Sequence, residues 1–151
     1  MRTLSLPFLL IALFAALLAG CSSGRSTVVG LRFELTGVEQ AADGSTKVSW
    51  RVLNPNLVAY LLAEGTHRIT LDGVPVGTFK HSTPIGVPAQ NQSDNVATLE
   101  TTAPSAAALA AAASRGRASY RLESQIVVRL FGDNIQKATF HNAGEVAVAA
   151  K

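Results

Sequence analysis

The sequence predicts an all-β protein, an antiparallel β-sandwich of the immunoglobulin or fibronectin III type with one short alanine-rich helix at about residues 104–114. Three observations predict this class. Apolar and polar residues alternate with a period of two in several short segments, as in strands that bury one face. Asp72-Gly73 has the composition of a two-residue hairpin turn. A single alanine run interrupts the alternation and favours a helix.

The composition indicates a single folded domain. The chain has 151 residues and a net charge of +3, with 48% hydrophobic and 15% charged residues. This balance is too apolar for a disordered chain and predicts a packed core. The single cysteine excludes an internal disulfide and a thiolate-rich zinc site. Because the 13 lysines and arginines form no block, we expect no nucleic-acid partner.

The N-terminal residues have the pattern of an export signal. Arg2 supplies a positive start, and the largely apolar stretch at 6–18 is shorter than the roughly 20 residues that cross a bilayer as a helix. Leu18-Ala19-Gly20-Cys21 follows and resembles the lipobox of bacterial lipoproteins. The resemblance implies cleavage between Gly20 and Cys21 and attachment of acyl chains to Cys21. An uncleaved anchor with an incidental cysteine is the alternative.

This resemblance divides the chain into a lipoprotein signal peptide at 1–20, a lipidated cysteine with a flexible polar tether at 21–28, and a sandwich domain at 29–150. It implies a membrane partner, held through the N-terminal acyl chains. Ser22 stands where an aspartate would act as an inner-membrane retention signal, so in a host with two membranes the resemblance implies the outer membrane, facing the periplasm. The six residues after Cys21 reach roughly 14 Å as a coil, which places the domain against its own membrane.

Strand signals recur through the rest of the chain. The clearest segments have an apolar residue at every second position, whereas 95–101 is weaker and 126–131 is almost entirely apolar. A bend is expected near 142–144, where Asn-Ala-Gly occurs. The expected strands lie at 31–36, 47–52, 66–71, 74–80, 95–101, 117–123, 126–131 and 137–148.

The alanine run carries the punctuation of a helix. Pro104 stands in the first turn, and Gly116 lies just past the expected end. Leu109 is its main candidate for burial. We expect this helix to lie across one end of the sandwich, with a low-complexity linker as the alternative.

Asn54-Pro55-Asn56 predicts a stiff turn after the strand at 47–52, because proline fixes its own φ and keeps Asn54 extended. Taken alone, it is compatible with an ordinary strand exit. The order of features around it resembles the late-embryogenesis-abundant (LEA) type 2 family, also called the water stress and hypersensitive response (WHy) domain. The features are this turn, the apolar stretch at 57–62, the strand at 66–71, the hairpin at 72–77, Val87-Pro88-Ala89-Gln90, the leucine-bearing helix and Tyr120-Arg121-Leu122.

The resemblance covers about residues 29–148. It implies a folded sandwich with one helix and a role in desiccation and stress tolerance. Bacterial members of the family are often lipoproteins. Glu123-Ser124-Gln125 departs from the family, in which a glycine often precedes the next strand. This departure leaves the strand register at 123–126 open.

Residues typical of catalysis or metal binding lack the spacing that such sites need. His67, His81 and His141 are far apart and predict no metal site. His67 falls on the apolar face of its strand, where we expect a hydrogen-bonded core imidazole. The carboxylates occur singly, and neither a Gly-x-Ser-x-Gly elbow nor a glycine-rich phosphate loop is present. We therefore expect no cofactor, no metal and no enzymatic activity.

Three arginines are candidates for contact with an anionic surface. Arg117, Arg121 and Arg129 fall on polar or mixed faces of two neighbouring candidate strands. If these strands pair, the three guanidiniums share one surface and attract anionic headgroups by about 1 kcal/mol each. Solvated strand faces explain the same residues equally well.

Two functional hypotheses follow. The leading one is a non-catalytic, membrane-anchored envelope lipoprotein of the WHy type that protects membrane or periplasmic proteins during desiccation or water stress. The alternative is an interaction or lipid-handling subunit of an envelope assembly, with envelope proteins or lipids as partners. In the second hypothesis the stretch at 57–62 lines a lipid groove, although packing in the core is its simpler use.

Overall fold

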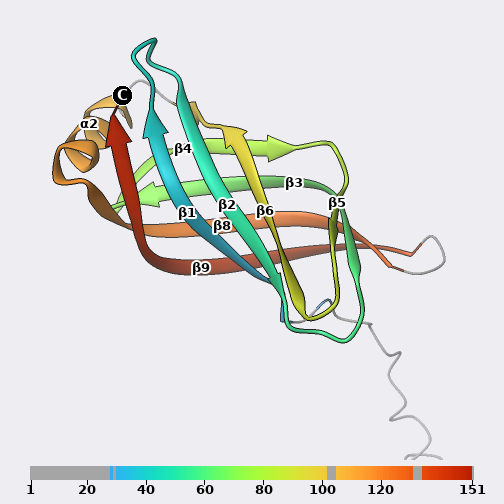
Figure 1. Cartoon of the computed structure of the whole chain (residues 1–151). Coiled ribbons are helices and arrows are strands. Elements are labelled where there is room, and N and C mark those ends of the chain that lie inside the picture. Colours follow the sequence, from blue (N-terminus) through green and yellow to red (C-terminus); the bar gives the residue numbers. More distant parts are fainter. Residues whose placement is uncertain (1–27, 29, 102–104, 131–133, 151) are drawn as a thin grey trace, which may run out of the picture.

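The computed structural model describes residues 28, 30–101, 105–130 and 134–150. Within these residues the chain forms nine strands and one helix (Figure 1). The predicted all-β class with one short helix is confirmed. In chain order the elements are β1 (Arg32–Gln40), β2 (Thr46–Asn54), β3 (Tyr60–Leu71), β4 (Val74–His81), β5 (Ile85–Val87), β6 (Asn91–Thr98), β7 (Glu100–Thr101), α2 (Ser105–Arg115), β8 (Arg117–Arg129) and β9 (Ile135–Ala150).

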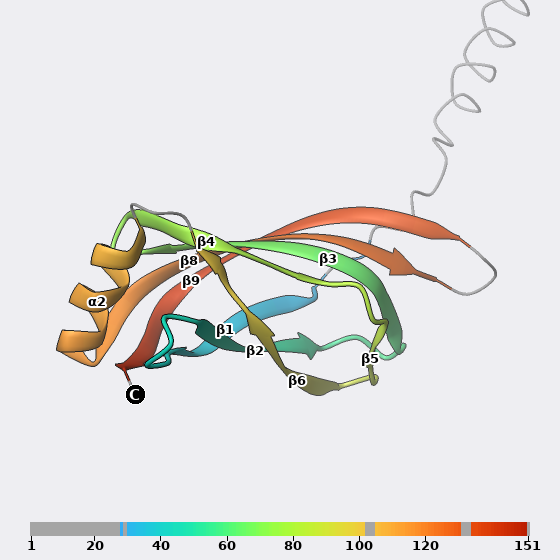
Figure 2. The ribbon, with the colours of Figure 1, turned by 90° about the horizontal axis from the view of Figure 1, so that it is seen from above.

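The strands form two facing layers (Figure 2). β1, β2 and β6 make one layer, and β3, β4, β5, β7 and β8 make the other. β9 joins the layers, because it pairs with β8 over residues 135–147 and then runs parallel to residues 38–40 of β1. The other pairings are antiparallel, so the predicted sandwich is a single sheet curled on itself.

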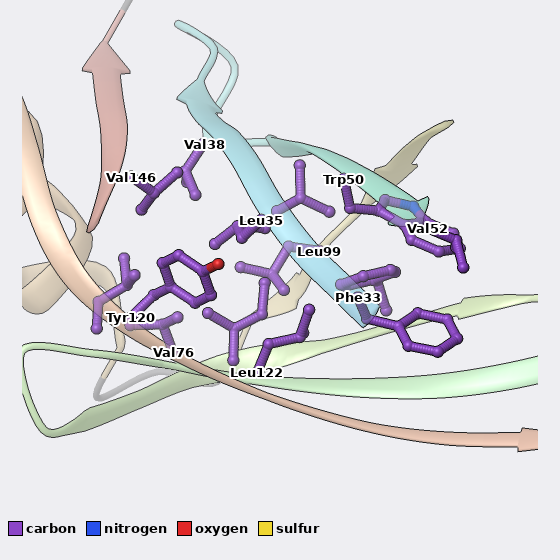
Figure 3. Packing of buried hydrophobic residues seen from close by; sticks show 14 of the residues in the cluster. Phe33, Leu35, Val38, Trp50, Val52, Val76, Leu99, Tyr120, Leu122 and Val146 are labelled. Carbon is purple, nitrogen blue, oxygen red and sulfur yellow. The ribbon is translucent and has the colours of Figure 1, made fainter. Parts of the chain in front are cut away.

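The period-two pattern sets which side chains enter the core. Trp50 and Phe33 are each 1% exposed. In Figure 3, Leu35 of β1 points into the core toward Tyr120 and Leu122 of β8. Burial of a large apolar side chain stabilises the fold by about 1.5–3 kcal/mol. The alternation therefore supplies both the inward faces and most of the driving force for packing the two layers.

The β3–β4 hairpin turns at Asp72-Gly73, as predicted. Asp72 has φ 45° and Gly73 has φ 83°, so both central residues adopt the left-handed conformation of a type I′ turn. The Asp72 carboxylate accepts hydrogen bonds from the backbone N–H and hydroxyl of Ser119, and Arg115 also donates to it. These bonds, led by the Ser119 hydroxyl, lower the pKa of Asp72 below its ordinary value of 3.8.

The alanine-rich segment is a helix, which excludes the linker alternative. α2 lies across one end of the sandwich (Figures 1 and 2) and buries Ser105, Leu109 and Ala112. It ends at Gly116, whose φ is 73° and whose N–H donates to the Ala113 carbonyl at 3.0 Å, as at many helix C-termini. Position 104 lies outside the described residues.

The expected break near 123–125 is wrong. Residues 117–129 form one continuous strand, in which Glu123 pairs with Arg68, Ser124 with His67 and Gln125 with Thr66. Ser124 points inward and hydrogen-bonds His67, so a polar residue occupies a buried position without interrupting the strand. This pairing also fixes the register that the sequence left open.

Two other boundaries differ from those expected. The weak strand at 95–101 is β6 and β7, between which Leu99 carries the chain from one layer to the other. β3 begins at Tyr60, so the apolar stretch at 57–62 spans a turn and the start of a strand.

The expected bend at 142–144 interrupts no pairing, because the β8–β9 register continues to Ala147.

Candidate functional site

Asn54 is the centre of the turn that the sequence singled out. Its side chain is buried, and its Nδ2 donates to the carbonyls of Val58 at 2.8 Å and Pro88 at 2.9 Å. Its Oδ1 accepts from the backbone N–H of Asn56 at 3.0 Å. The Asn56 carbonyl in turn accepts from the Gln90 N–H at 2.9 Å. A side chain with both donors and an acceptor therefore joins the β2–β3 and β5–β6 turns into one unit.

The N-terminal segment enters the fold at these turns. Val28 is 7% exposed, and a Cβ placed on Gly30 would lie 3.4 Å from Cγ of Pro55. We call this end, made of Gly30, the β2–β3 turn at 55–59 and the β5–β6 turn at 88–90, the entry end. α2 and the C-terminus lie at the opposite end, which we call the helix end (Figure 1).

The entry end exposes two large apolar side chains. Leu57 is 80% exposed and Val58 is 48% exposed, whereas Leu62 is fully buried. The stretch at 57–62 therefore divides between surface and core and does not line one groove. Trp50, Phe33 and Phe79 fill the space between the layers, which weighs against an acyl chain held there.

The three arginines share one outward face, but the expectation that they come from two neighbouring strands is wrong. Arg117, Arg121 and Arg129 all lie on β8, because 126–129 continues the strand and does not form its neighbour. At about 3.3 Å per residue, Arg117 and Arg129 are roughly 40 Å apart. Arg117 lies at the helix end, with its Nη1 4.0 Å from Oε2 of Glu145, and Arg129 lies toward the entry end.

Arg121 lines a groove on the outer face of the layer that contains β3, β4 and β8. The groove has a volume of about 780 Å³ and is also lined by Arg68, Glu123 and His141. Arg68 Nη1 donates to Glu123 Oε1 at 3.2 Å, so part of the charge is paired. The groove is open to solvent and is lined by both apolar and charged side chains.

Two of the three histidines meet inside the sandwich. His67 has 0% exposure, its Nδ1 lies 2.9 Å from Ser124 Oγ, and its Nε2 lies 3.2 Å from His81 Nδ1. The predicted core imidazole at His67 is thus confirmed. Burial lowers the pKa of His67 from 6.5 to about 3, and the neighbouring His81 adds to this shift. Burial likewise lowers the pKa of His81, against an opposing effect of Glu64.

The contact between the histidines comes from the hairpin. Residue 67 pairs with residue 79 and residue 65 with residue 81, which places His81 diagonally opposite His67. Gly65 leaves room for the ring, because a Cβ there would lie 2.4 Å from His81 Cε1. The register irregularity between Ile69 and Thr70 shifts the pairing by one residue and brings the two histidines to the same face of the hairpin. His141 is on β9 and remains exposed.

Ser124 and His67 form a pair that the sequence patterns did not predict. A serine hydroxyl beside an imidazole is the arrangement of many hydrolases. Both residues have 0% exposure here, so a substrate carbonyl cannot reach the hydroxyl without opening the core. The pair satisfies buried polar groups and supports the packing of β8 on β3. Across the described ranges, no group of three or more His, Cys, Asp or Glu side chains is placed to hold a metal ion.

Gly20 and Cys21 lie outside the described residues. Signal cleavage and lipid attachment therefore stay predictions. In the part of the chain that the structure covers, no helix has the length and apolar character needed to span a bilayer.

Neither a family model nor a curated protein matches the sequence. Solved structures resemble it at low sequence identity. A protein from Arabidopsis thaliana, solved in solution, has a TM-score of 0.55 at 12% identity, with 87% of this chain and 91% of that chain covered. A solution structure of a candidate LEA protein has a TM-score of 0.47 at 9% identity, covering 99% and 94%. A crystal structure from Archaeoglobus fulgidus has a TM-score of 0.46 at 14% identity, covering 80% and 97%. The first likeness establishes a shared fold and nothing about activity.

Proposed function

We propose that this protein is a non-catalytic envelope lipoprotein, anchored through Cys21 to the outer membrane and facing the periplasm, which contributes to tolerance of water stress. The observation that carries the proposal is the short connection between anchor and fold. Cys21 lies seven positions (28 − 21) before Val28, which is already buried at the entry end. A domain attached in this way acts at the surface of its own membrane.

The physical character of the domain supports action by contact. Its core is packed between two layers, so a disordered, hydrophilic shield is not its mode of protection. Within the described residues β6 pairs with β2 on one side only and lies at the edge of the sheet. Such an edge offers backbone groups to an extended segment of a partly unfolded client protein. The burial of Ser124 and His67 supports a role without bond-breaking chemistry.

The stress role rests on the resemblance of the sequence to the WHy family. The order of the Asn54 turn, the Asp72-Gly73 hairpin and the leucine-bearing helix carries that resemblance. The fold shared with the Arabidopsis thaliana protein is compatible with it.

Fatty-acid labelling and survival assays test the two halves of the proposal. The wild-type chain should incorporate a labelled fatty acid and sediment with membranes, whereas Cys21→Ser should do neither. Deletion of the gene should lower survival after drying, and only the wild-type copy should restore it fully. A mature product that retains residues 1–20 and an unmodified thiol contradicts the anchor. Unchanged survival of the deletion strain contradicts the stress role.

The groove on the outer face favours a second candidate function, an interaction or lipid-handling subunit of an envelope assembly. Its volume of about 780 Å³ and its unequal charges suit a polar partner or a lipid headgroup. Native mass spectrometry of the protein extracted from membranes separates the two functions. A stoichiometric protein partner or co-purified lipid favours the second, and a bare monomer favours the first.

A further inference from the structure

Three of the five exposed large apolar side chains among the described residues lie toward one end of the sandwich, and the other two, Val74 and Val96, lie elsewhere. Leu57 and Val58 occupy the β2–β3 turn at the entry end. Ile135, which is 59% exposed, begins β9, and β8 lies between β9 and the start of β3. Ile135 pairs with Arg129, which also pairs with Leu61 near the start of β3. These three apolar residues therefore share an end of the molecule that a water-facing role does not explain.

Unpaired positive charge lies at the same end. Arg32 pairs along the sheet with Leu53, directly before the Asn54 turn, and Arg129 and Lys137 lie on the part of the β8–β9 hairpin toward the entry end. All three are exposed, and the ion pairs formed among the described residues use other cations. On β3, Glu64 is the carboxylate closest to these cations, because it pairs with Val127, which in turn pairs with Lys137. The apolar side chains are thus accompanied by a net positive charge.

The turn that carries Leu57 is held in a defined conformation. The buried Asn54 amide binds the Val58 carbonyl on the far side of the turn and the Pro88 carbonyl of the next one. Leu57 therefore projects from a braced turn, and its exposure does not result from a loose loop. A preorganised apolar side chain loses little conformational entropy when it enters an apolar phase.

The length of the connection to Cys21 selects which end meets the bilayer. Seven residues span at most about 25 Å when fully extended. β8, with 13 residues, is about 43 Å long, so the connection is shorter than the long dimension of the domain. Since the chain enters beside Pro55, an anchor at Cys21 keeps the entry end next to the membrane and the helix end away from it.

We infer that the entry end is a membrane-contact surface, at which Leu57 and Val58 insert at the headgroup level of the bilayer that holds Cys21 while Arg32, Arg129 and Lys137 face lipid phosphates. The inference rests on the proposed lipid anchor. Apolar side chains gain free energy by leaving water, and cations near an anionic leaflet are attracted to it. The domain would then sit upright on the membrane, with its β6 edge and outer groove accessible from the side.

Two variants of the full lipidated chain, each with one cysteine added to the lipid-modified Cys21, test this orientation. Leu57→Cys places a thiol at the entry end, and Val74→Cys places a matched thiol at the helix end, where Val74 is 42% exposed. Each is labelled with an environment-sensitive fluorophore and reconstituted into vesicles of phosphatidylcholine and phosphatidylglycerol. We expect a blue shift and quenching by brominated lipids at position 57, and emission as in water at position 74. Water-like emission at both positions overturns the inference.

Charge variants and vesicle flotation make the outcomes separable. Arg129→Glu should reduce quenching of the label at position 57 in phosphatidylglycerol vesicles, whereas Arg117→Glu, at the helix end, should leave it unchanged. Equal effects of the two variants refute the role of the entry-end cations. If the lipidated protein floats with vesicles but position 57 stays in water, this inference fails and the anchor stands. If the wild-type chain carries no fatty acid, the proposed anchor fails and this inference fails with it.

Discussion

Acidification should destabilise this protein through the two imidazoles that meet between its layers. His67 is fully buried and in contact with Ser124 and His81, and burial holds the pKa of His67 at about 3. In the unfolded chain the pKa of a histidine is about 6.5. As the pH falls from 6.5 towards 3, the unfolded chain binds a proton that the folded protein does not. The free energy of unfolding therefore falls over this window and is highest above it.

The size of the effect follows from the difference between the two pKa values of His67. With pKa values of about 3 and 6.5, proton linkage lowers the free energy of unfolding by about 2 kcal/mol between pH 8 and pH 5, and by about 3 kcal/mol at pH 4. The lowered pKa of His81 acts in the same direction. The lowered pKa values of Asp43 and Asp72 affect stability near and below their ordinary value of 3.8, so pH 5–8 isolates the histidines.

Urea denaturation at several pH values measures this dependence directly. Trp50 is the one tryptophan of the chain and is buried, and the centroid of its ring lies 4.6 Å from that of His67. Its fluorescence therefore reports loss of the core. The wild-type protein should lose at least about 2 kcal/mol between pH 8 and pH 5, of which about 2 kcal/mol comes from His67. His67→Gln, which keeps a polar partner for Ser124, should lower stability at pH 8 but flatten the pH dependence. His141→Gln removes an exposed histidine and should keep the wild-type slope.

Two results would refute this reasoning. Equal slopes for the wild-type protein and His67→Gln would show that the buried imidazole does not control acid stability. Stability that rises from pH 8 to pH 5 would show that a histidine is protonated in the folded state. The double variant His67→Gln/His81→Gln should have the flattest profile, since it removes both imidazoles whose pKa burial lowers.

Three further predictions concern packing and the entry end. Gly65→Ala should lower the free energy of unfolding by about 1–3 kcal/mol, because the new Cβ would lie 2.4 Å from His81 Cε1; an unchanged urea midpoint would contradict this. Leu109→Ala should cost about 2–5 kcal/mol, since Leu109 is 2% exposed on the buried face of α2, whereas the matched Leu57→Ala should stay within about 0.5 kcal/mol of wild type in the same titration. Asn54→Ala should cost about 1–3 kcal/mol and speed amide hydrogen exchange in the β2–β3 and β5–β6 turns; protection equal to wild type there would argue against the bridging role of Asn54.

Local patterns in the sequence determined the elements of this fold. Alternation at 31–36 and 47–52 defined buried faces because successive side chains of a strand point to opposite sides. The Asp72-Gly73 turn and the end of the helix at Gly116 were also predictable, since each needs a left-handed backbone that few residues adopt. These features depend only on neighbours along the chain.

Polar residues inside strands were harder to interpret. Glu123-Ser124-Gln125 has the composition of a turn, and only the partner across the sheet makes Ser124 acceptable at a buried position. Because this composition predicts a turn, the sequence predicts two strands in place of β8, with Arg117 and Arg129 on neighbouring strands. In the structure Arg117 and Arg129 lie at opposite ends of one long strand. The contact of His67 with His81 likewise needed the hairpin register, including its irregularity between Ile69 and Thr70.

The sequence by itself specified the two-faced strands, the tight hairpin, the capped helix and a resemblance to exported lipoproteins. The tertiary structure alone decided that Leu57, Ile135 and Arg129 lie toward the end at which the N-terminal segment enters, and that the His67 imidazole is enclosed. Such groupings join residues far apart in the chain, and they depend on strand register and on the curl of the sheet. Both are set by the packing of the whole core, which no short segment encodes.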